Sequence, residues 1–392
     1  MSTTPAVTNA HWLRAEDCRL EDLLVVLDTE TVLADYPFAA RVEQGVLVYD
    51  GAAVCDALAR GEGPAVEAEL CRAWTEGPGI VVLTGAFTGE VLDPVTSAYD
   101  AIVAAEKSAG GERGDHFGKP GANDRIWNAL EKLAVQDPEA FVDYYANDLL
   151  ALGARAWLGP GYQVTAQANI VRPGGAGQTV HRDYHLGFMD ADQAARYPAH
   201  VHAMSPRLTL QGAVAHVDMP VESGPTLYLP HSQKYPLGYL AYWLPEFQEY
   251  FVAHHVQLPL TAGDLVWFNP ALFHAAGSNT SVDIQRMANL LQVNSAFGRA
   301  MESVDRARVV EAIHPALAAR VAAGWSAEAV AHVVAASAEG YPFPSNLDRA
   351  QPVGGMAPPS QAELVHEALA AGASTAELVE RLAAQAATTQ SH

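Results

Sequence analysis

Residues 262–274 read Ala262-Gly-Asp-Leu-Val-Trp-Phe-Asn-Pro-Ala-Leu-Phe-His274, which is a turn, an apolar strand and then a histidine. Other short runs rich in β-forming residues lie on both sides of this stretch, and Pro or Gly turns separate them. These runs cover residues 163–171, 207–217, 226–229, 264–268 and 286–294. Several short strands within ~130 residues predict a sandwich or barrel-like all-β core.

Helical patterns flank this core on both sides. Apolar residues at helical spacing predict helices over 65–74, 91–107, 125–153, 304–318, 326–337 and 361–371. A buried strand is expected over 79–84, and the Gly-rich, charged stretch 108–123 is expected to be a loop. The predicted fold class is therefore a mainly β core with flanking helices.

Composition and charge exclude several classes of partner. The 392 residues carry 23 Lys plus Arg against 45 Asp plus Glu, a formal net charge of −22, without a cluster of basic residues. Such a chain repels nucleic acid and anionic membranes, so we expect neither as a partner. No apolar run reaches the length of a membrane span.

The cysteines and the first residues bear on the compartment. Cys18, Cys55 and Cys71 lie far apart and lack CxxC spacing, so neither a disulfide framework nor a thiolate zinc site is expected. The chain does not open with a positive region followed by an apolar one, as a secretory signal would. We therefore expect a cytoplasmic location.

A His-x-Asp pair on a strand can hold a metal ion, because residues i and i+2 point to the same face. Two imidazoles and one carboxylate on one face leave positions open for a co-substrate and O2, as non-haem iron chemistry requires. The chain contains two such pairs, His181-Arg-Asp183 and His216-Val-Asp218, about as many as its composition predicts by chance. Context must therefore decide between them.

The first pair has the more suitable context. It follows the turn-forming stretch Arg172-Pro-Gly-Gly-Ala-Gly-Gln178, and a third ligand, His274, stands at the end of a later strand. His216-x-Asp218 instead ends an apolar run whose alternation indicates sheet packing. We therefore predict His181, Asp183 and His274 as metal ligands and catalytic centre.

Further stretches extend this pattern in a fixed order over residues 75–297. They are Gly79-Ile-Val-Val-Leu-Thr-Gly-Ala-Phe87, Glu222-Ser-Gly-Pro-Thr-Leu-Tyr-Leu-Pro-His-Ser-Gln-Lys234, Ala262-Gly-Asp264, His274-Ala-Ala-Gly-Ser-Asn279 and Arg286. Together with His181-Arg-Asp183, they resemble the phytanoyl-CoA dioxygenase (PhyH) family of Fe(II)/2-oxoglutarate-dependent oxygenases. The resemblance implies a double-stranded β-helix (jelly-roll) core with Fe(II) at its mouth, 2-oxoglutarate as co-substrate and O2 as oxidant. It also implies that Arg286 pairs with the distal carboxylate of 2-oxoglutarate, which a planar guanidinium can bind through two hydrogen bonds.

Other residues near these motifs allow more than one interpretation. Gln167 and Asn169 share a strand face, so they could contact the co-substrate or be ordinary sheet residues. His185 is expected to have a pocket or structural role, because a third histidine would over-fill the metal site. Arg182 should point away from the metal by strand alternation and form an ion pair. Three aromatic residues could line the pocket or belong to the core: Tyr184, Trp267 and Phe268.

The resemblance also divides the chain and suggests its activity. We expect an N-terminal lead-in packed on the core (1–65), an Fe(II)/2-oxoglutarate dioxygenase jelly-roll domain (66–299) and a C-terminal helical extension (300–392). The extension could cap the barrel or form a homodimer interface. The expected reaction hydroxylates or otherwise oxidises a small organic molecule, releasing succinate and CO2, whereas halogenation is disfavoured because Asp183 supplies a carboxylate. The alternatives are a cupin-type oxygenase or isomerase that does not use 2-oxoglutarate, and a non-catalytic binding protein.

Overall fold

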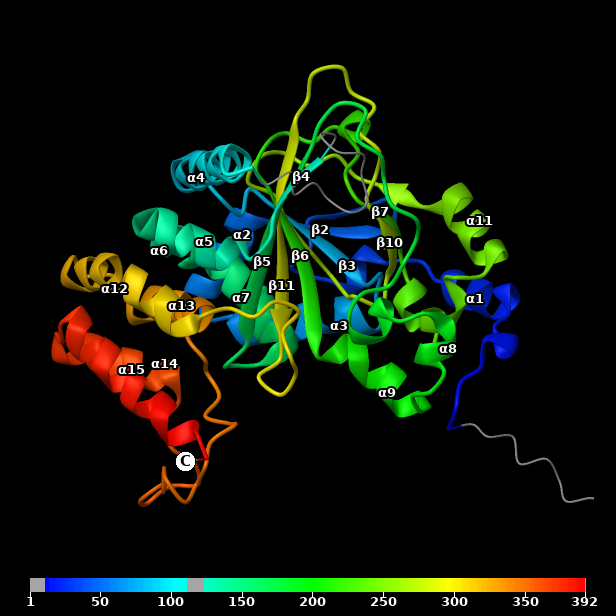
Figure 1. Cartoon of the computed structure of the whole chain (residues 1–392). Coiled ribbons are helices and arrows are strands. Elements are labelled where there is room, and N and C mark those ends of the chain that lie inside the picture. Colours follow the sequence, from blue (N-terminus) through cyan, green and yellow to red (C-terminus); the bar gives the residue numbers. More distant parts are fainter. Residues whose placement is uncertain (1–10, 111–122, 392) are drawn as a thin grey trace, which may run out of the picture.

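A computed structural model of the protein describes residues 11–110 and 123–391, and its centre consists of two β-sheets (Figure 1). The larger sheet has eight strands, in the order β1 (Arg41–Glu43), β2 (Val46–Asp50), β3 (Ile80–Thr84), β9 (Leu265–Phe268), β6 (Thr209–Ala215), β11 (Arg286–Asn294), β5 (Gln163–Val171) and β4 (Asn123–Ile126). All neighbours in this sheet are antiparallel except β2 and β3. The smaller sheet has the order β10 (Phe273–Ala275), β7 (Leu227–Leu229) and β8 (Val256–Gln257).

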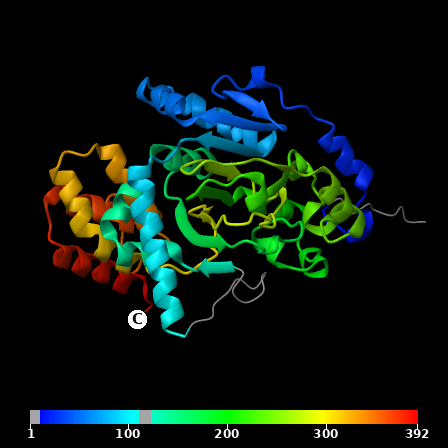
Figure 2. The same cartoon turned by 90° about the horizontal axis from the view of Figure 1, so that it is seen from above.

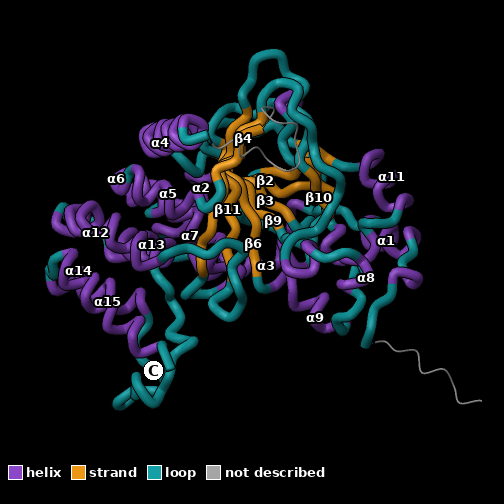
Figure 3. Tube along the Cα trace, in the orientation of Figure 1, coloured by secondary structure: helices purple, strands orange, loops and turns teal. Residues whose placement is uncertain are grey.

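One face of the larger sheet is covered by helices, which gather beside it in Figure 3. These are α2 (Gly51–Ala59), α3 (Gly63–Thr75), α4 (Gly89–Ser108), α5 (Ala129–Gln136), α6 (Pro138–Tyr145), α7 (Asp148–Leu158), α12 (Arg306–Ala322) and α13 (Ala327–Ser337). Within this set, α3 contacts β3, α7 contacts β6, and both α5 and α13 contact β5. Outside it, α14 (Gln361–Ala371) and α15 (Thr375–Thr389) pack on α12 and on each other.

A second set of short helices lies on the side of the smaller sheet. It comprises α1 (Leu20–Leu27), α8 (Ala191–Ala194), α9 (Ala199–Met204), α10 (Gly238–Ala241) and α11 (Pro245–His254). The view from above separates this set from the C-terminal helices, which lie at the opposite end of the molecule (Figure 2). No helix within residues 11–110 and 123–391 is long and apolar enough to cross a membrane.

Strand alternation explains why the central strands are buried on both faces. In β9, Leu265 and Trp267 join the core under the helices, whereas Val266 and Phe268 face the smaller sheet. The same division in β5 sends its alanines into the helical core and leaves the polar Gln167 and Asn169 on the other face. The larger sheet therefore has one mainly apolar face, on which Asn289 donates to the Tyr144 hydroxyl, and one face that carries the polar residues of the cavity.

The predicted mainly β, jelly-roll core with flanking helices is confirmed, and β5 and β11 have the predicted bounds. Three local expectations were wrong or incomplete. Residues 123–126 form an edge strand rather than the start of a helix, because they pair with β5. Within the expected N-terminal lead-in, β1 and β2 form strands that extend the larger sheet. The last helix, α15, was not predicted, and most of the expected loop 108–123 lies outside the described residues.

Candidate metal centre

The three predicted ligands meet where the chain crosses between the two sheets. His274 is the middle residue of β10, and an isolated β-bridge joins it to His181 through backbone N–H···O bonds of 3.0 and 3.2 Å. The Asp183 N–H donates to the carbonyl of Pro270 at 3.0 Å. The pair was expected on a regular strand, but residues 181–183 are an irregular extended segment. Asp183 of this segment pairs with Pro270, which lies in the turn between β9 and β10. The same turn separates His274 from β9, although this histidine was expected at the end of that strand.

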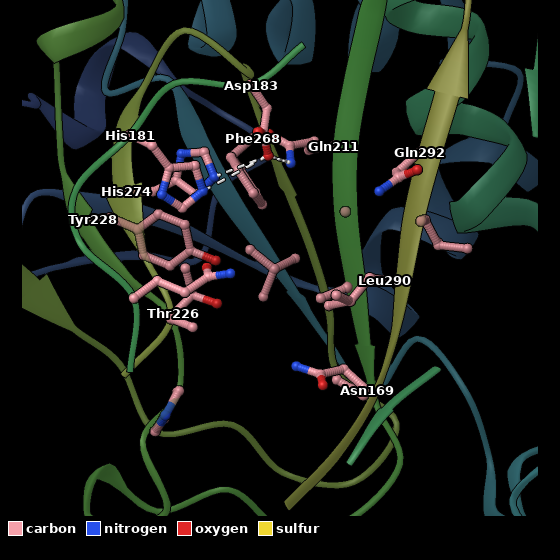
Figure 4. Close-up of a pocket in the computed structure, with 18 of the residues that line it drawn as sticks. Asn169, His181, Asp183, Gln211, Thr226, Tyr228, Phe268, His274, Leu290 and Gln292 are labelled. Atoms are coloured by element: carbon pink, nitrogen blue, oxygen red, sulfur yellow. Dashed lines mark hydrogen bonds and ion pairs between the residues drawn. The ribbon is translucent and has the colours of Figure 1, made fainter. Parts of the chain in front are cut away.

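The side chains of these three residues converge, as Figure 4 shows. Asp183 Oδ2 lies 3.5 Å from His274 Nε2 and 3.9 Å from His181 Nε2, and one ligand atom from each residue lies within 4.8 Å of the other two. Both Nδ1 atoms lie 2.8 Å from backbone carbonyls, those of Thr179 and Leu272. A carbonyl only accepts, so each Nδ1 carries the hydrogen and each Nε2 presents its lone pair to the centre. This geometry suits a metal ion.

The protonation states also suit a cation. Burial lowers the pKa of His181, and the neighbouring His274 lowers it further, so its imidazole is neutral at physiological pH. Burial alone would raise the pKa of Asp183, but His181, His274 and Gln211 together outweigh it and hold that pKa at about 2. The neutral imidazole of His181, the ionised carboxylate of Asp183 and Nε2 of His274 form a donor set that divalent iron, nickel or zinc can bind.

Arg182, between two of the predicted ligands, points away from them as expected, but it forms no ion pair with any residue of 11–110 or 123–391. Its buried Nη2 donates to the carbonyls of Ser232 at 2.6 Å and Tyr235 at 3.0 Å. The guanidinium also lies over the rings of Tyr239 and Phe273. Because Phe273 precedes His274, Arg182 ties the segment that carries His181 and Asp183 to the strand that carries His274.

The metal centre opens into a cavity of about 500 Å³ between the two sheets. Its wall includes all three predicted cofactor-binding residues, Arg286, Gln167 and Asn169. Buried Arg286 donates to the carbonyl of Gly277 at 3.2 Å, and burial lowers its pKa to about 10, which leaves it charged at neutral pH. Gln167 accepts from Arg125 at 3.1 Å. Buried Asn169 Oδ1 has no hydrogen-bond partner within the described ranges.

The remaining sequence candidates are distributed between the cavity and the core. Phe268 lines the cavity, whereas Trp267 on the same strand lies in the helical core. Tyr184 is buried outside the cavity wall, and His185 contacts Ser205 Oγ at 3.2 Å.

The other His-x-Asp pair has structural contacts. His216 lies within 2.8 Å of Thr96 Oγ1 and 3.3 Å of the Tyr144 hydroxyl, and burial lowers its pKa to about 3. Asp218 accepts from the N–H of Ala262 at 2.9 Å.

Several polar residues of the site were missed by reasoning from sequence. Gln211 on β6, Gln292 on β11 and Tyr228 on β7 all line the cavity, and Gln211 donates to Asp183 Oδ2 at 2.6 Å. A signal for Gln292 was present, because it is six residues after Arg286 and even spacing places both on one face of a strand. Gln211 could have been noticed as an amide within an otherwise apolar run.

Comparison with known proteins agrees with the motif order. The family model described as Phytanoyl-CoA dioxygenase (PhyH) matches residues 75–288, more than half of the chain. No curated protein matches the sequence.

Solved structures that resemble the chain include three enzymes of low sequence identity. The α-ketoglutarate-dependent epimerase SnoN of nogalamycin biosynthesis is 20% identical over 59% of this chain and 84% of its own, with a TM-score of 0.38. The carbocyclase SnoK of the same biosynthesis is 18% identical over 60% of this chain and 86% of its own, with a TM-score of 0.42. HygX from Streptomyces hygroscopicus was crystallised with nickel, 2-oxoglutarate and hygromycin B. It is 15% identical over 58% of this chain and 87% of its own, with a TM-score of 0.39.

Proposed function

Because the chain belongs to the phytanoyl-CoA dioxygenase family of 2-oxoglutarate-dependent non-haem iron enzymes, we propose that it oxidises a small organic molecule at an Fe(II) ion held by His181, Asp183 and His274. The observation that carries the proposal is the convergence of two Nε2 lone pairs and one ionised carboxylate at the mouth of a buried cavity. Three protein ligands on one side leave the opposite positions for a co-substrate and O2.

Arg286 is the proposed partner of the distal carboxylate of 2-oxoglutarate. It is the cavity-lining guanidinium on the long strand β11, and its charge is retained despite burial. Asn169 stands across the register from Ala288 on the neighbouring strand, also in the cavity wall, so its amide can add a hydrogen bond. Gln167 is a weaker candidate, because its Oε1 already accepts from Arg125.

The iron and its co-substrate would supply the oxidant as 2-oxoglutarate loses CO2 and becomes succinate. The residues of this chain would hold the metal through His181, Asp183 and His274 and would fix the co-substrate through Arg286. Phe188, Tyr242 and Trp243 line the cavity and contribute an apolar wall. A cavity of about 500 Å³ fits a small-molecule substrate, and hydroxylation is the reaction we propose for it.

An anaerobic titration tests this function. Metal-free protein receives Fe(II) and then 2-oxoglutarate, and we expect the weak visible charge-transfer band of a chelated 2-oxo acid. The band should be absent in His181→Ala and Asp183→Ala at the same protein concentration. Failure of the wild-type protein to bind Fe(II) would refute the proposal.

Arg286 distinguishes this function from that of a cupin-type enzyme that does not use 2-oxoglutarate. In Arg286→Ala the apparent Kd of 2-oxoglutarate, read from the same band, should rise about 10- to 150-fold, because a charge-assisted hydrogen bond contributes ~1.5–3 kcal/mol. Fe(II) affinity should be retained. Binding of Fe(II) without any band in the wild type would support the cupin-type alternative.

A further inference from the structure

The carboxylate of Asp183 accepts a hydrogen bond from a residue outside the three proposed ligands. Gln211, in the middle of β6, extends its side chain across the cavity face of the larger sheet (Figure 4). Its Nε2 donates to Asp183 Oδ2 at 2.6 Å. The orientation of the amide follows from chemistry, since an ionised carboxylate only accepts and must therefore face the NH2 end.

The accepting oxygen is the one that also faces the imidazoles. Asp183 Oδ2 lies 3.5 Å from His274 Nε2 and 3.9 Å from His181 Nε2, and it is this oxygen, not Oδ1, that Gln211 contacts. A carboxylate oxygen has two lone pairs, so one can take the amide hydrogen while the other points into the space between the imidazoles. The hydrogen bond therefore fixes the rotation of the carboxylate about its own axis.

We propose that Gln211 is a positioning residue, whose amide holds the Asp183 carboxylate in the orientation that binds the metal through one oxygen. This inference rests on the proposed metal site. Gln211 is well suited to the task because its backbone is paired on both sides, with Gln292 of β11 and Phe268 of β9. The irregular segment 181–183 thus takes the orientation of its ligand from a regular strand of the opposite sheet.

The oxygen of the same amide differs from its nitrogen in having no hydrogen-bond partner within the described ranges. Gln211 Oε1 is buried and has no hydrogen-bond partner among the residues described. A buried acceptor without a partner is costly, by about 1–3 kcal/mol. The amide thus keeps its bond to Asp183 while its other end stays without a partner among the described residues.

The chain offers a matched control in Gln292. It is the cross-strand partner of Gln211 and lines the same cavity, but the hydrogen bond its side chain accepts comes from Thr165 Oγ1, at 3.4 Å. Replacing either glutamine by methionine conserves side-chain length and removes the amide. Only Gln211→Met removes a hydrogen bond to Asp183.

The experiment titrates metal-free protein with Co(II) under anaerobic conditions, without 2-oxoglutarate, and follows the visible Co(II) absorption. In Gln211→Met we expect Co(II) affinity to fall about 10- to 100-fold, the usual effect of losing an outer-shell partner of a ligand. The band positions should also change, because the carboxylate can rotate to bind through both oxygens. In Gln292→Met affinity should stay within about twofold of wild type and the spectrum should be unchanged.

Including Asp183→Ala separates two outcomes that would contradict the expectation. If Asp183→Ala abolishes Co(II) binding while Gln211→Met retains wild-type affinity and spectrum, the role of Gln211 is refuted and the metal site stands. If Asp183→Ala binds Co(II) normally, the metal site itself is refuted. Thermal unfolding of the metal-free variants establishes that they are folded, and Gln211→Leu replaces Gln211→Met if the latter does not fold.

Discussion

The two sides of the cavity are built differently. The sheet wall, formed by β5, β6 and β11, presents Asn169, Gln211 and Arg286 from long strands that are paired along their length. The ligand segment, residues 181–183, has one isolated bridge to β10 and depends on side-chain contacts to hold its shape. On the sheet wall continuous backbone pairing places the side chains, whereas the ligand segment has few backbone hydrogen bonds and is also held by the side chain of Arg182.

This difference determines how a substitution on each side should affect ligand binding and stability. A substitution on the sheet wall changes what the cavity binds, because the strand beneath it remains paired. A substitution that disturbs the supports of the ligand segment should change stability and metal binding together. Four predictions test this distinction, beginning with the largest effect.

The largest effect is expected at His274, the proposed metal ligand that lies on the smaller sheet and packs on the larger one. His274→Ala removes an Nε2 donor and the ring that packs on Phe268, whose centroid lies 4.9 Å away. Co(II) affinity should fall by well over the ~100-fold expected for an outer-shell partner. The measurement is the titration used for Gln211, and His254→Ala, at an exposed position on α11, is its control with wild-type affinity expected.

Gly238→Ala tests the support of the ligand segment. A Cβ at this position would lie 1.8 Å from Cζ of Arg182, so the buried guanidinium would have to leave its two carbonyl partners. We expect the free energy of unfolding to fall by about 3 kcal/mol, the upper range for overpacking. Urea unfolding followed by circular dichroism measures it.

The control for that substitution is Gly63→Ala at the start of α3, where the nearest atom would be Leu58 Cδ2 at 3.5 Å. Its unfolding free energy should change by less than about 1 kcal/mol. Equal destabilisation by the two substitutions would contradict the special role of the Arg182 contacts. Co(II) affinity should also decrease in Gly238→Ala alone.

The stability of the folded chain should depend on pH through His216, which lies on the helical side of the larger sheet. His216 is buried and burial lowers its pKa to about 3, below the ordinary value of 6.5. Between these values the unfolded chain binds a proton that the folded chain does not, so stability is present above pH 6.5 and is lost as the pH falls. From pH 7 to pH 5 the loss due to this residue should be about 2 kcal/mol.

Replacing His216 isolates that contribution. In His216→Gln the urea midpoint should depend less on pH between 7 and 5 than in the wild type, even though the variant is less stable at pH 7. Unchanged pH dependence would show that His216 is not buried in its neutral form. Metal-free protein should be used, so that protonation of the proposed ligands does not contribute through metal release.

The smallest effect on stability is expected on the sheet wall. Asn169→Ala removes a buried Oδ1 that has no partner in the described ranges, so the unfolding free energy should change by no more than about 1 kcal/mol. Co(II) affinity should equal that of wild type, while the Kd of 2-oxoglutarate should rise if the amide contacts the co-substrate. A loss of metal binding in this variant would contradict the separation between the two sides.

The same distinction explains what the sequence could predict. The bounds of β5 and β11 followed from their composition, because alternation and β-branched residues act locally. The role of residues 181–183 as a strand could not be judged, since their pairing depends on a turn some 90 residues later in the chain. Gln211 was missed for a related reason, because only the fold brings β6 opposite Asp183.

Edge elements were also hard to predict from local patterns. Residues 123–126 continue into a helical region and carry polar side chains, and only the presence of β5 makes them a strand.

For Arg182, the local pattern predicted the direction of the side chain but not its partners. Alternation gave its direction correctly, but the acceptors proved to be backbone carbonyls, which a sequence pattern does not reveal.

The order of strands in the larger sheet has a consequence for biosynthesis. β3 ends at Thr84, and one of its two neighbours, β9, begins at Leu265. At about 5–20 residues per second, a ribosome needs roughly 10–35 s to make the chain between them. Throughout that interval one edge of an apolar strand has no native partner, and such edges are prone to aggregation. Slower synthesis of residues 85–264 should therefore lower the soluble yield, and co-expressed chaperones should restore it.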